Sequence, residues 1–460
     1  MSDEPVTPPP VVAQPLPDAL RPHVALGKPG EAILIFDGPI TFMQAGNSCR
    51  TDARISLRWL PSPAIHLEVP KIPEGIYPKL GEFSLCLDDG TEVPHGFVTG
   101  IPMSMRGEVF SASLSGIINE RVVRPADEPV TYAMFLLPNF DQPSGHGILY
   151  PDRSRRASRL TLKGGGWNIN LDSVDDRKNV EDDLKVNSGF GITQVGRLER
   201  EDQSSFSAVD AQAALSALAW YVSFAAGRWT GPCLTTGFDA GGKQMWQVWD
   251  YNRTVPFRHR ESWVDRVHGE QFEGPFPGFM KLWLDDTWEE VARLAIHWYI
   301  EANALAGSVE GSIVLTQTAF ELLASAVLTD HNGWLSQEGS DKLSAADRIR
   351  LLFLWAGIPT GIPSELGDLI KLAKSFEDFM LNKIPDAAAA MTTIRNTITH
   401  PTRKNREKFG KHSYEGRTDA WTLGLRNLEL CLLKLFEHRG TYADRIARKW
   451  QGEVVPVPWK

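Results

Sequence analysis

Three polar residues near the C-terminal end of the chain have types and spacing suited to phosphate chemistry. Residues 393–401 read TIRNTITHP, which places Arg395, Asn396 and His400 close together. RNA carries its own nucleophile, the 2′-hydroxyl. An imidazole can remove its proton or protonate the leaving oxygen, and a guanidinium can stabilise the developing charge on the phosphate. Asn396 can orient His400 or bind a phosphate oxygen, so this chemistry needs no metal and no cofactor.

A helical conformation would separate these groups from an apolar stripe. At about 100° per residue, four side chains fall within about 40° of one another, namely Ala387, Met391, Ile394 and Ile398. Arg395 lies roughly 70° from that stripe. Asn396, Thr399 and His400 fall on the far side, where Asn396 and His400 are one turn apart. We therefore expect a polar face with catalytic groups, in which Thr399 is a candidate orienting residue.

The R-x4-H spacing alone is a weak signal, although the chain contains it only once. In a non-catalytic alternative, Arg395 pairs with a carboxylate elsewhere in a helical bundle. His400 is then a helix-end residue that the helix dipole favours. Glu321 is a candidate for the orienting carboxylate near Arg395, and the alternative is that it faces solvent.

A basic stretch follows the motif directly and contains Arg403, Lys404, Arg406, Lys408 and Lys411. Beside a phosphate-cleaving site these cations would gather the RNA backbone. The alternative is a solvated loop. Arg406 and His412 in this loop-like stretch resemble the motif but have five residues between them instead of four. We interpret that pair as a decoy, a chance similarity without a catalytic role.

The elements that must position the motif are helices. From about residue 285 the apolar period becomes helical, which is typical of a compact bundle of about five helices. Capping-box spacing occurs at Thr287 with Glu290 and at Ser344 with Asp347. Pro401 would close the helix that carries the motif. The expected helices cover residues 287–300, 309–328, 344–357, 385–400 and 418–438, with a short one after 364.

Residues 29–284 instead have the pattern of many short strands with turn signals, which favours a sandwich or barrel-like region. Asp88-Asp89-Gly90 predicts a hairpin turn. Asp210 to Ala226 predicts one inserted helix that Gly227 ends. Gly237 to Lys243 matches much of a phosphate-binding loop, but a strand follows and Ser or Thr is missing, so we expect a hairpin there.

Composition narrows the class of protein. The formal net charge of −9 argues against a protein that coats nucleic acid non-specifically, so any nucleic-acid contact must be local. The 4 cysteines form no C-x-x-C pair, and no membrane span or secretory signal is recognised, which favours the cytoplasm.

Residues 1–28 are proline-rich and predict a flexible tail. A second basic run at 153–163 predicts a mobile surface loop.

The C-terminal part resembles the HEPN superfamily, whose ribonucleases carry R-[polar]-x3-H late in a helical bundle. Residues 395–400 fit this form, including the polar residue after the arginine and the closing proline. Residues 299–323, with Glu310 and Phe320-Glu321-Leu322-Leu323, and residues 356–359 are similar to bacterial anti-phage HEPN proteins of the ApeA type. The resemblance covers about residues 290–445 and assigns no family to residues 29–284.

This resemblance implies an endoribonuclease, usually a dimer in which two motifs face one cleft, with a role in defence or toxicity. We therefore predict an α+β protein with a β-rich sensing or regulatory region at 29–284 and an all-α HEPN-like bundle at 285–460. A homodimer also follows from chemistry, because the reaction needs a base and an acid whereas one motif has a single histidine. The expected partners are RNA and a phage-derived or small-molecule trigger, with no membrane.

The rival hypothesis is a non-catalytic module. In that case the bundle serves dimerisation or the binding of a nucleotide or RNA, and the β-rich region recognises a ligand. A carbohydrate-active enzyme is a weaker alternative, because no pair of carboxylates stands out in the β-rich region to support it.

Overall fold

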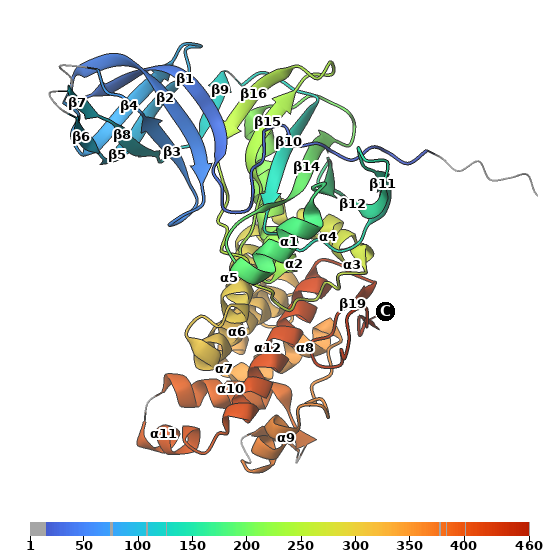
Figure 1. Ribbon diagram of the computed structural model, residues 1–460. Helices are drawn as coiled ribbons and strands as arrows, with labels where there is room; N and C mark the ends of the chain where they lie inside the picture. Colours follow the sequence, from blue (N-terminus) through green and yellow to red (C-terminus); the bar gives the residue numbers. More distant parts are fainter. Residues whose placement is uncertain are drawn as a thin grey trace, which may run out of the picture.

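A computed structural model of the chain describes residues 15–73, 77–106, 109–125, 127–376, 379–382, 384–400 and 402–459. The strands gather at one end of the molecule and the C-terminal helices at the other (Figure 1). At the strand end, a large sheet lies beside a small barrel, and helices cover the sheet on the side away from the barrel. This arrangement confirms a mixed α and β protein with a β-rich N-terminal region and helices toward the C-terminus.

Six of the first strands close into a barrel of order β1-β2-β3-β8-β5-β4. Its interior side chains alternate along each strand, as Ile55 and Leu57 on β2 show, because successive residues of a strand point to opposite faces. The predicted Asp88–Gly90 turn is confirmed, since it joins β4 to β5 in an antiparallel pair. The barrel strands are β1 (Ile33–Gln44), β2 (Asn47–Arg58), β3 (Ala64–Val69), β4 (Gly81–Leu87), β5 (Glu92–Gly100) and β8 (Leu114–Ile118). A separate hairpin is formed by β6 (Met103–Arg106) and β7 (Val109–Ala112).

The second sheet has 8 strands in the order β11-β12-β13-β14-β10-β15-β16-β9. Its central strand β10 divides the hydrophobic core between two faces. Met134 and Leu136 join the core on the barrel side, whereas Phe135 and Leu137 join the core on the helix side. The sheet is therefore the shared wall between the barrel and the helices. Its strands are β9 (Val122–Pro125), β10 (Tyr132–Pro138), β11 (His146–Leu149), β12 (Arg155–Gly164), β13 (Trp167–Ser173), β14 (Ile192–Arg200), β15 (Cys233–Phe238) and β16 (Gln244–Trp249).

Two predictions about loops in this region have opposite outcomes. The glycine-rich segment at 237–243 forms the turn between β15 and β16, which confirms a hairpin. The basic run at 153–163 was predicted as a mobile loop, and that is wrong, because most of it is strand β12. Its cations alternate with buried Leu160 and Leu162, and Arg159 pairs with the buried Asp172 at 2.6 Å. The alternation of polar and apolar residues, not the charge, decided the structure.

Helix α2 (Ala208–Ala226) is the predicted inserted helix and lies at the centre of the molecule. Ser207 and Asp210 form a capping box at its start, and Gly227 ends it in a left-handed conformation at φ 62°. Most of its sides are buried, so it is apolar around most of its circumference. Tyr221 packs against aromatic rings of the two helices that follow the sheet. The other helices of this region are α1 (Arg177–Asn187), α3 (Gly269–Glu273) and α4 (Phe276–Trp283).

The C-terminal helices occur close to where the apolar period predicts them. Ser344 caps α8 through the Asp347 amide, and Gly357 ends that helix at φ 74°. The capping box at Thr287 is wrong, because Asp285 accepts the Thr287 amide and α5 begins later without a side-chain cap. The helices are α5 (Glu289–Asn303), α6 (Ser308–Ser325), α7 (Gln337–Lys342), α8 (Ala345–Ala356), α9 (Gly367–Lys374), α10 (Ala387–Thr399), α11 (Arg403–Phe409) and α12 (Tyr414–Leu435).

Smaller elements complete this part of the chain. A π-helical turn, η1 (Ala326–His331), extends α6. Two short strand pairs also occur among the helices, so the part from residue 285 on is not purely α-helical. They are β17 (Met380–Leu381) with β18 (Ile384–Pro385), and β19 (Thr441–Tyr442) with β20 (Val455–Pro456). Pro401, predicted to close α10, lies outside the described residues.

The long helix formed by α6 and η1, Ser308–His331, is long and apolar enough to cross a membrane by these two criteria alone. Within the molecule, 61% of its most apolar window is buried. It contacts α5, α8, α10 and α12. Its composition therefore has a sufficient explanation in its place at the centre of the helical bundle.

The structure of the N-terminal segment tests the prediction that residues 1–28 form a flexible tail. Residues 1–14 lie outside the described residues, but residues 15–28 are bound to the sheet. Asp18 forms a bridge with Leu149, and the Leu20 amide donates to the Asp172 carboxylate at 2.8 Å. The His23 ring is buried against the Leu234 carbonyl, and burial lowers its pKa to about 4. From Asp18 on, the chain therefore has specific partners that its proline content did not indicate.

One buried ion pair joins the C-terminal segment to two helices and to the β-rich region. The Arg445 guanidinium donates to the Glu429 carboxylate of α12 at 2.7 Å, and the two side chains are 4% and 0% exposed. It also donates to the Tyr299 hydroxyl of α5 at 3.1 Å and to the Glu261 carbonyl at 2.6 Å. The pKa of Arg445 is raised, because the nearby Glu429 charge outweighs the burial that lowers it.

Replacing Arg445 with leucine should destabilise the protein by about 3–5 kcal/mol, because Glu429 would remain buried without its counter-charge. The measurement is urea-induced unfolding followed by tryptophan fluorescence. Arg439→Ala is the matched control, since Arg439 is exposed on the same segment, and it should change stability by less than about 0.5 kcal/mol. Equal unfolding curves for the two variants would contradict this role of the ion pair.

Candidate functional site

Helix α10 carries the predicted motif and is anchored at its first turn. The Asp386 carboxylate accepts the Ala389 amide at 2.7 Å and the Arg350 guanidinium of α8 at 2.9 Å. The apolar stripe is confirmed, since Ala387, Met391 and Ile394 are buried. Ile398 packs against the same core and is partly buried. The helix is thus held between α6, α8 and α12, which leaves one face for polar groups.

Arg395 lies on that polar face, where it has two polar neighbours. Its Nη1 donates to Asn396 Oδ1 at 3.0 Å, and its Nη2 lies 3.5 Å from Glu321 Oε1 of α6. The Arg395 and Glu321 side chains are 24% and 28% exposed. Gln317, one turn earlier on α6, donates to the same Glu321 oxygen at 3.1 Å. The sequence left two alternatives for Glu321, orientation toward Arg395 or toward solvent. In the structure, Glu321 is oriented toward Arg395.

Arg395 keeps unused hydrogen-bonding capacity. Its Nε is buried, and among the described residues it has no hydrogen-bond partner. A guanidinium has five N–H donors, of which the contacts with Asn396 and Glu321 use only part. The side chain is thus held in place but not saturated, as a phosphate-binding arginine requires.

His400 lies at the end of α10 rather than within it. Its backbone is extended, with φ −109° and ψ 91°, while its amide still donates to the Asn396 carbonyl. The side chain is exposed, and within the described part of the chain no partner contacts the imidazole. The Asn405 side chain donates to the His400 carbonyl at 2.9 Å, which fixes the backbone where the helix ends. The imidazole is therefore accessible to a substrate.

Thr399 does not orient His400. Its hydroxyl donates to the Arg395 carbonyl at 3.1 Å, one turn back along the helix. This local hydrogen bond to the backbone is common for threonine in helices. The predicted orienting role of Thr399 is therefore not supported by this geometry, and Glu321 and Asn396 are the groups that contact Arg395.

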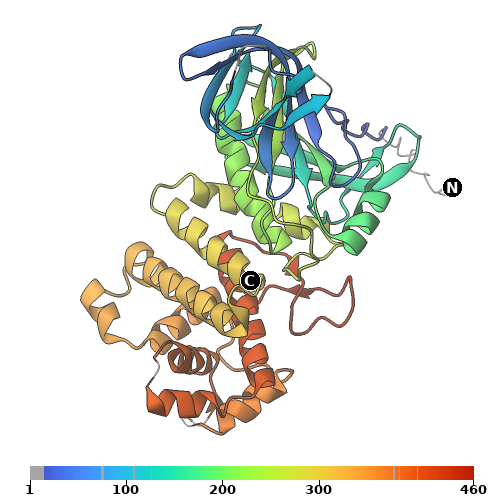
Figure 2. The ribbon, with the colours of Figure 1, turned by 60° about the vertical axis from the view of Figure 1, so that its left-hand side comes forward.

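The basic stretch after the motif is helical instead of a loop. Helix α11 is capped by Thr402, whose side chain accepts the Asn405 amide, and none of its residues is buried. Arg403 pairs with Glu407 at 2.9 Å, with the two side chains 89% and 62% exposed. Figures 1 and 2 place α10 and α11 at the end of the bundle that is farthest from the barrel. The positive charges of α11 thus lie beside the end of α10 in an accessible position.

The histidine of the decoy pair has a different environment. His412 is 5% exposed and packs against the rings of Phe376, Phe379 and Phe409. Burial, followed by the nearby Arg417 and Lys408 charges, lowers its pKa to about 4, so the ring is neutral near pH 7. His412 is a core residue, which agrees with its interpretation as a decoy.

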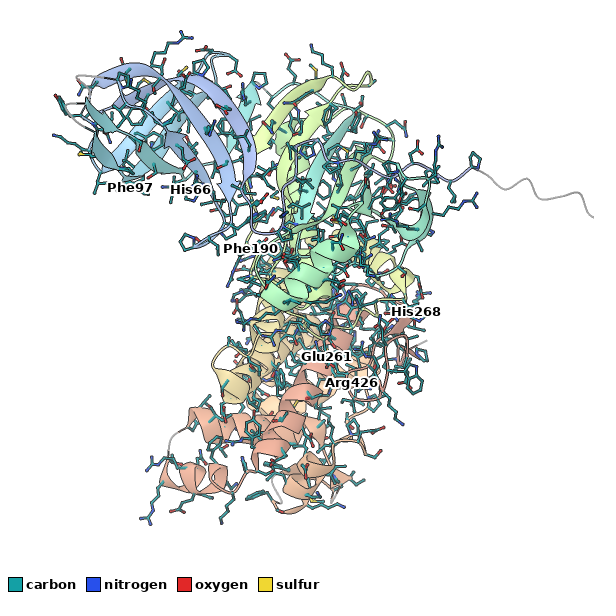
Figure 3. All side chains as sticks on the ribbon, viewed as in Figure 1. His66, Phe97, Phe190, Glu261, His268 and Arg426 are labelled. Atoms are coloured by element: carbon teal, nitrogen blue, oxygen red, sulfur yellow. The ribbon has the colours of Figure 1, made fainter. Side chains whose placement is uncertain are left out.

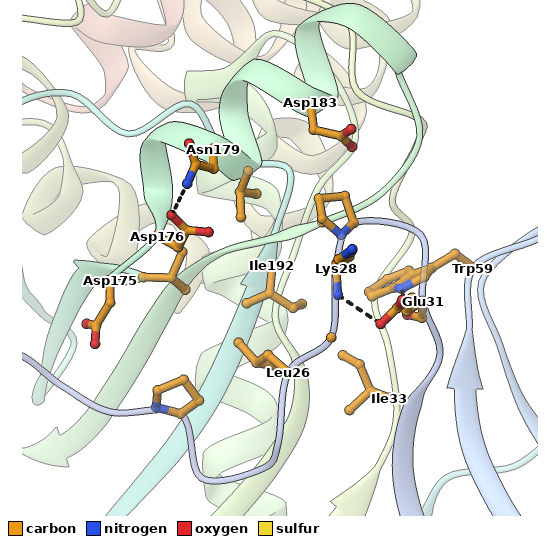
Figure 4. Close-up of a pocket in the computed structure, with 16 residues that line it drawn as sticks. Leu26, Lys28, Glu31, Ile33, Trp59, Asp175, Asp176, Asn179, Asp183 and Ile192 are labelled. Atoms are coloured by element: carbon orange, nitrogen blue, oxygen red, sulfur yellow. Dashed lines mark hydrogen bonds between the residues drawn. The ribbon is translucent and has the colours of Figure 1, made fainter.

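A large cavity lies far along the chain from the motif. It has a volume of about 740 Å³ and is formed by the N-terminal segment, the start of the barrel and helix α1 (Figure 4). Leu26, Ile33 and Ile192 supply an apolar floor, and Asp176, which precedes α1, and Asp183 of α1 lie at its edge. Sequence reasoning missed this cavity because its lining residues are spread over separate segments without a shared motif. Among the described residues, no group of three or more His, Cys, Asp or Glu is arranged to hold a metal.

Asp386→Ala should destabilise the protein by about 2 kcal/mol, because α10 loses its cap and Arg350 loses a partner. Asp386→Asn is the matched variant, since an asparagine oxygen can still accept the Ala389 amide, and it should be less destabilising. Thermal unfolding followed by circular dichroism compares the two. An alanine variant as stable as the wild type would show that this cap does not anchor α10.

Comparison with known proteins identifies two matched segments. Residues 125–260 match the family described as the YopA central domain, and residues 285–456 match the YopA C-terminal domain. The chain is also 26% identical over 443 residues to the SPbeta prophage-derived uncharacterized protein YopA of Bacillus subtilis (strain 168), covering 94% of this chain and 95% of that relative. No solved structure matches the chain. The chain is thus similar to a YopA protein along nearly its whole length, and the HEPN resemblance stays a prediction.

Proposed function

We propose that this chain is a metal-independent, HEPN-type endoribonuclease that cleaves RNA by attack of the 2′-hydroxyl. The observation that supports this most is the geometry of α10. A half-buried Arg395, held by Asn396 and Glu321, lies on the same helix as the exposed imidazole of His400. The cation and the amide thus occupy a helix face that the core does not use, and the exposed imidazole follows where that helix ends.

In this proposal each residue has one role. His400 acts as the acid or base, since its exposed imidazole can reach the 2′-hydroxyl or the leaving oxygen of a bound RNA. Arg395 binds the scissile phosphate and stabilises the charge of the pentacoordinate transition state. Asn396 orients the Arg395 guanidinium and offers its own amide to a phosphate oxygen. Glu321 positions Arg395 and does not touch the RNA.

The neighbouring helix α11 would guide the substrate. Its cations and the lysine that follows it are Arg403, Lys404, Arg406, Lys408 and Lys411. Electrostatic attraction to the RNA backbone does not need a basic protein as a whole, only a local concentration of positive charge. The whole chain has a net charge of −9, so the rest of the surface would repel RNA and favour binding at this end.

We further propose that the β-rich region controls this activity in the cytoplasm. The motif and the barrel lie at opposite ends of the molecule, so a trigger at the N-terminal region would act through the intervening sheet and helices (Figure 2). The YopA relative is described as prophage-derived. A ribonuclease encoded by or acting against phages fits a role in abortive infection, with a phage-derived or small-molecule trigger.

One observation favours a second candidate function. The Arg395–Glu321 ion pair is the contact that a non-catalytic module predicts, because a bundle carboxylate there neutralises the arginine. In that case the bundle would serve dimerisation or the binding of RNA or a nucleotide without cleavage. Activity of variants separates the two functions.

His400→Ala and Arg395→Ala should each lower the rate of RNA cleavage by about 100-fold or more, because each removes a group that acts in the transition state. Cleavage of a labelled RNA pool in the presence of a chelator is the measurement, and growth arrest on expression is the cellular readout. His95→Ala in the barrel is the matched control, since His95 is exposed and remote, and it should leave cleavage unchanged.

The folded state of each variant is checked by its thermal unfolding midpoint. Loss of the half-exposed Arg395–Glu321 pair should change stability by no more than about 1 kcal/mol. Wild-type binding of RNA with no cleavage under any trigger, and with no difference among the variants, would instead support the non-catalytic module.

The active enzyme should be a two-fold symmetric dimer in which His400 of each chain serves as acid or base for a shared phosphate. The expected mass in light scattering is twice that of one chain. Mixing His400→Ala with wild-type chains should reduce activity by more than the dilution of wild type predicts, because mixed dimers lose one histidine. A strictly monomeric protein with full activity would refute the dimer.

A further inference from the structure

A second cavity lies where the β-rich region meets the helices and the C-terminal segment. Its volume is about 310 Å³, near the lower end of the range for small-molecule sites. Its wall comes from the loop after β10, from α1, from the end of α2, from residues 257–266 and from the C-terminal segment. Glu261 marks this junction at the waist of the molecule (Figure 3).

Positive side chains line this cavity from several segments: Lys185, Arg260, Arg266 and Arg448. Arg266 pairs with Asp141 and with Glu181, and Arg448 lies 3.8 Å from Asp265. Lys185 lies 3.4 Å from Asp182 of its own helix. Arg260 differs, because among the described residues no carboxylate or carbonyl contacts its guanidinium.

A further arginine lies behind the wall. Arg228 is 4% exposed, its guanidinium lies 4.8 Å from the ring centre of Phe257, and it donates to the Asn139 carbonyl. Its Nη1 is buried without a partner in the described part of the structure. Burial lowers the pKa of Arg228 to about 10, and burial followed by the Arg258 charge lowers the pKa of Arg260. Positive charge is therefore concentrated at this wall, where the Asp141 charge offsets part of the effect of burial on Arg228.

The acidic groups of the cavity are already engaged or exposed. The Asp265 carboxylate accepts the amides of Val267 and Gly452, each at 2.8 Å. Asp141 is bound by Arg266. Glu261 is exposed, where water and salt screen its charge. Arg260 is half-buried and has no carboxylate partner among the described residues, whereas Glu261 is exposed, so the cavity favours an anion over a cation.

The remaining wall is apolar. Phe140 and Phe257 line it with 2% and 4% of their surface exposed, and Ala225, Ala226 and Val264 contribute small aliphatic surface. Apolar surface favours the organic part of a ligand, and arginines favour phosphate oxygens. The cationic side of the cavity suits the phosphate of a small molecule, and the apolar side suits an organic ring attached to it.

We propose that this cavity binds a small phosphorylated ligand, with its phosphate at Arg260 and its organic part against Phe140 and Phe257. Such a ligand would contact the loop after β10, α1 and the C-terminal segment together. It would therefore stabilise their arrangement at the junction through which the two ends of the molecule are connected. This site does not depend on the ribonuclease proposal, because its residues are separate from α10.

The test is calorimetric titration of the full chain with adenosine monophosphate, ribose 5-phosphate, inorganic phosphate and uncharged adenosine. Saturable binding of the phosphorylated probes is expected, with adenosine bound weakly or not at all. Arg260→Gln should weaken that binding at least about tenfold, because a charge-assisted contact is lost. Arg258→Gln is the matched control, since Arg258 is exposed and does not line the cavity, and it should preserve the affinity.

The probes also separate two sources of the anion. Tighter binding of adenosine monophosphate than of inorganic phosphate supports a ring-bearing ligand, and equal binding supports a site for free phosphate. Arg260→Lys, which keeps the charge, should retain part of the affinity and shows that the variant site is folded. No saturable binding of any phosphorylated probe at millimolar concentration, or equal binding by wild type and Arg260→Gln, would overturn the proposal.

Discussion

The buried pair of Arg445 and Glu429 is the constraint on which the arrangement of the whole chain depends. Two opposite charges without water are stable only when each remaining donor and acceptor is satisfied. Here the Tyr299 hydroxyl and the Glu261 carbonyl complete the network. These groups belong to the C-terminal segment, two helices and the loop below the sheet, so the network forms only when all four are in place. The helical bundle and the β-rich region are therefore packed as one body rather than linked by a tether.

This constraint has a consequence for communication between the two ends. The core on the helix side is one continuous cluster that includes residues of the sheet, α2 and the bundle, among them Phe135, Leu218 and Ile394. A close-packed interior transmits strain, so a change at the sheet can reach α10 through direct contacts. The cationic cavity lies beside the Arg445 network, and Glu261 takes part in both. A ligand bound there would act at the point where the two ends are joined.

Local sequence signals predicted several helix ends, although the capping-box spacing at Thr287 and Glu290 did not form a cap. The Ser344–Asp347 spacing, Gly227 and Gly357 specify helix ends through contacts within four residues of the chain. They failed where charge was given more weight than periodicity. The run at 153–163 became a strand because Leu160 and Leu162 face the core, and the stretch at 403–409 became a helix because Thr402 caps it.

For the candidate site, the amino-acid sequence alone was enough to place Arg395 and Asn396 on the polar face of a helix, because helical periodicity is a local property. It did not place His400, which follows the last helical residue with an extended backbone. It left open whether Glu321 faces Arg395, since that contact joins residues 74 positions apart and depends on how α6 crosses α10. The cationic cavity could not be predicted from the sequence for the same reason. Arg228, Arg260 and Arg448 are far apart in the sequence and form no motif. Only long-range packing brings these side chains together, and packing is decided by the complete set of buried contacts rather than by any one segment.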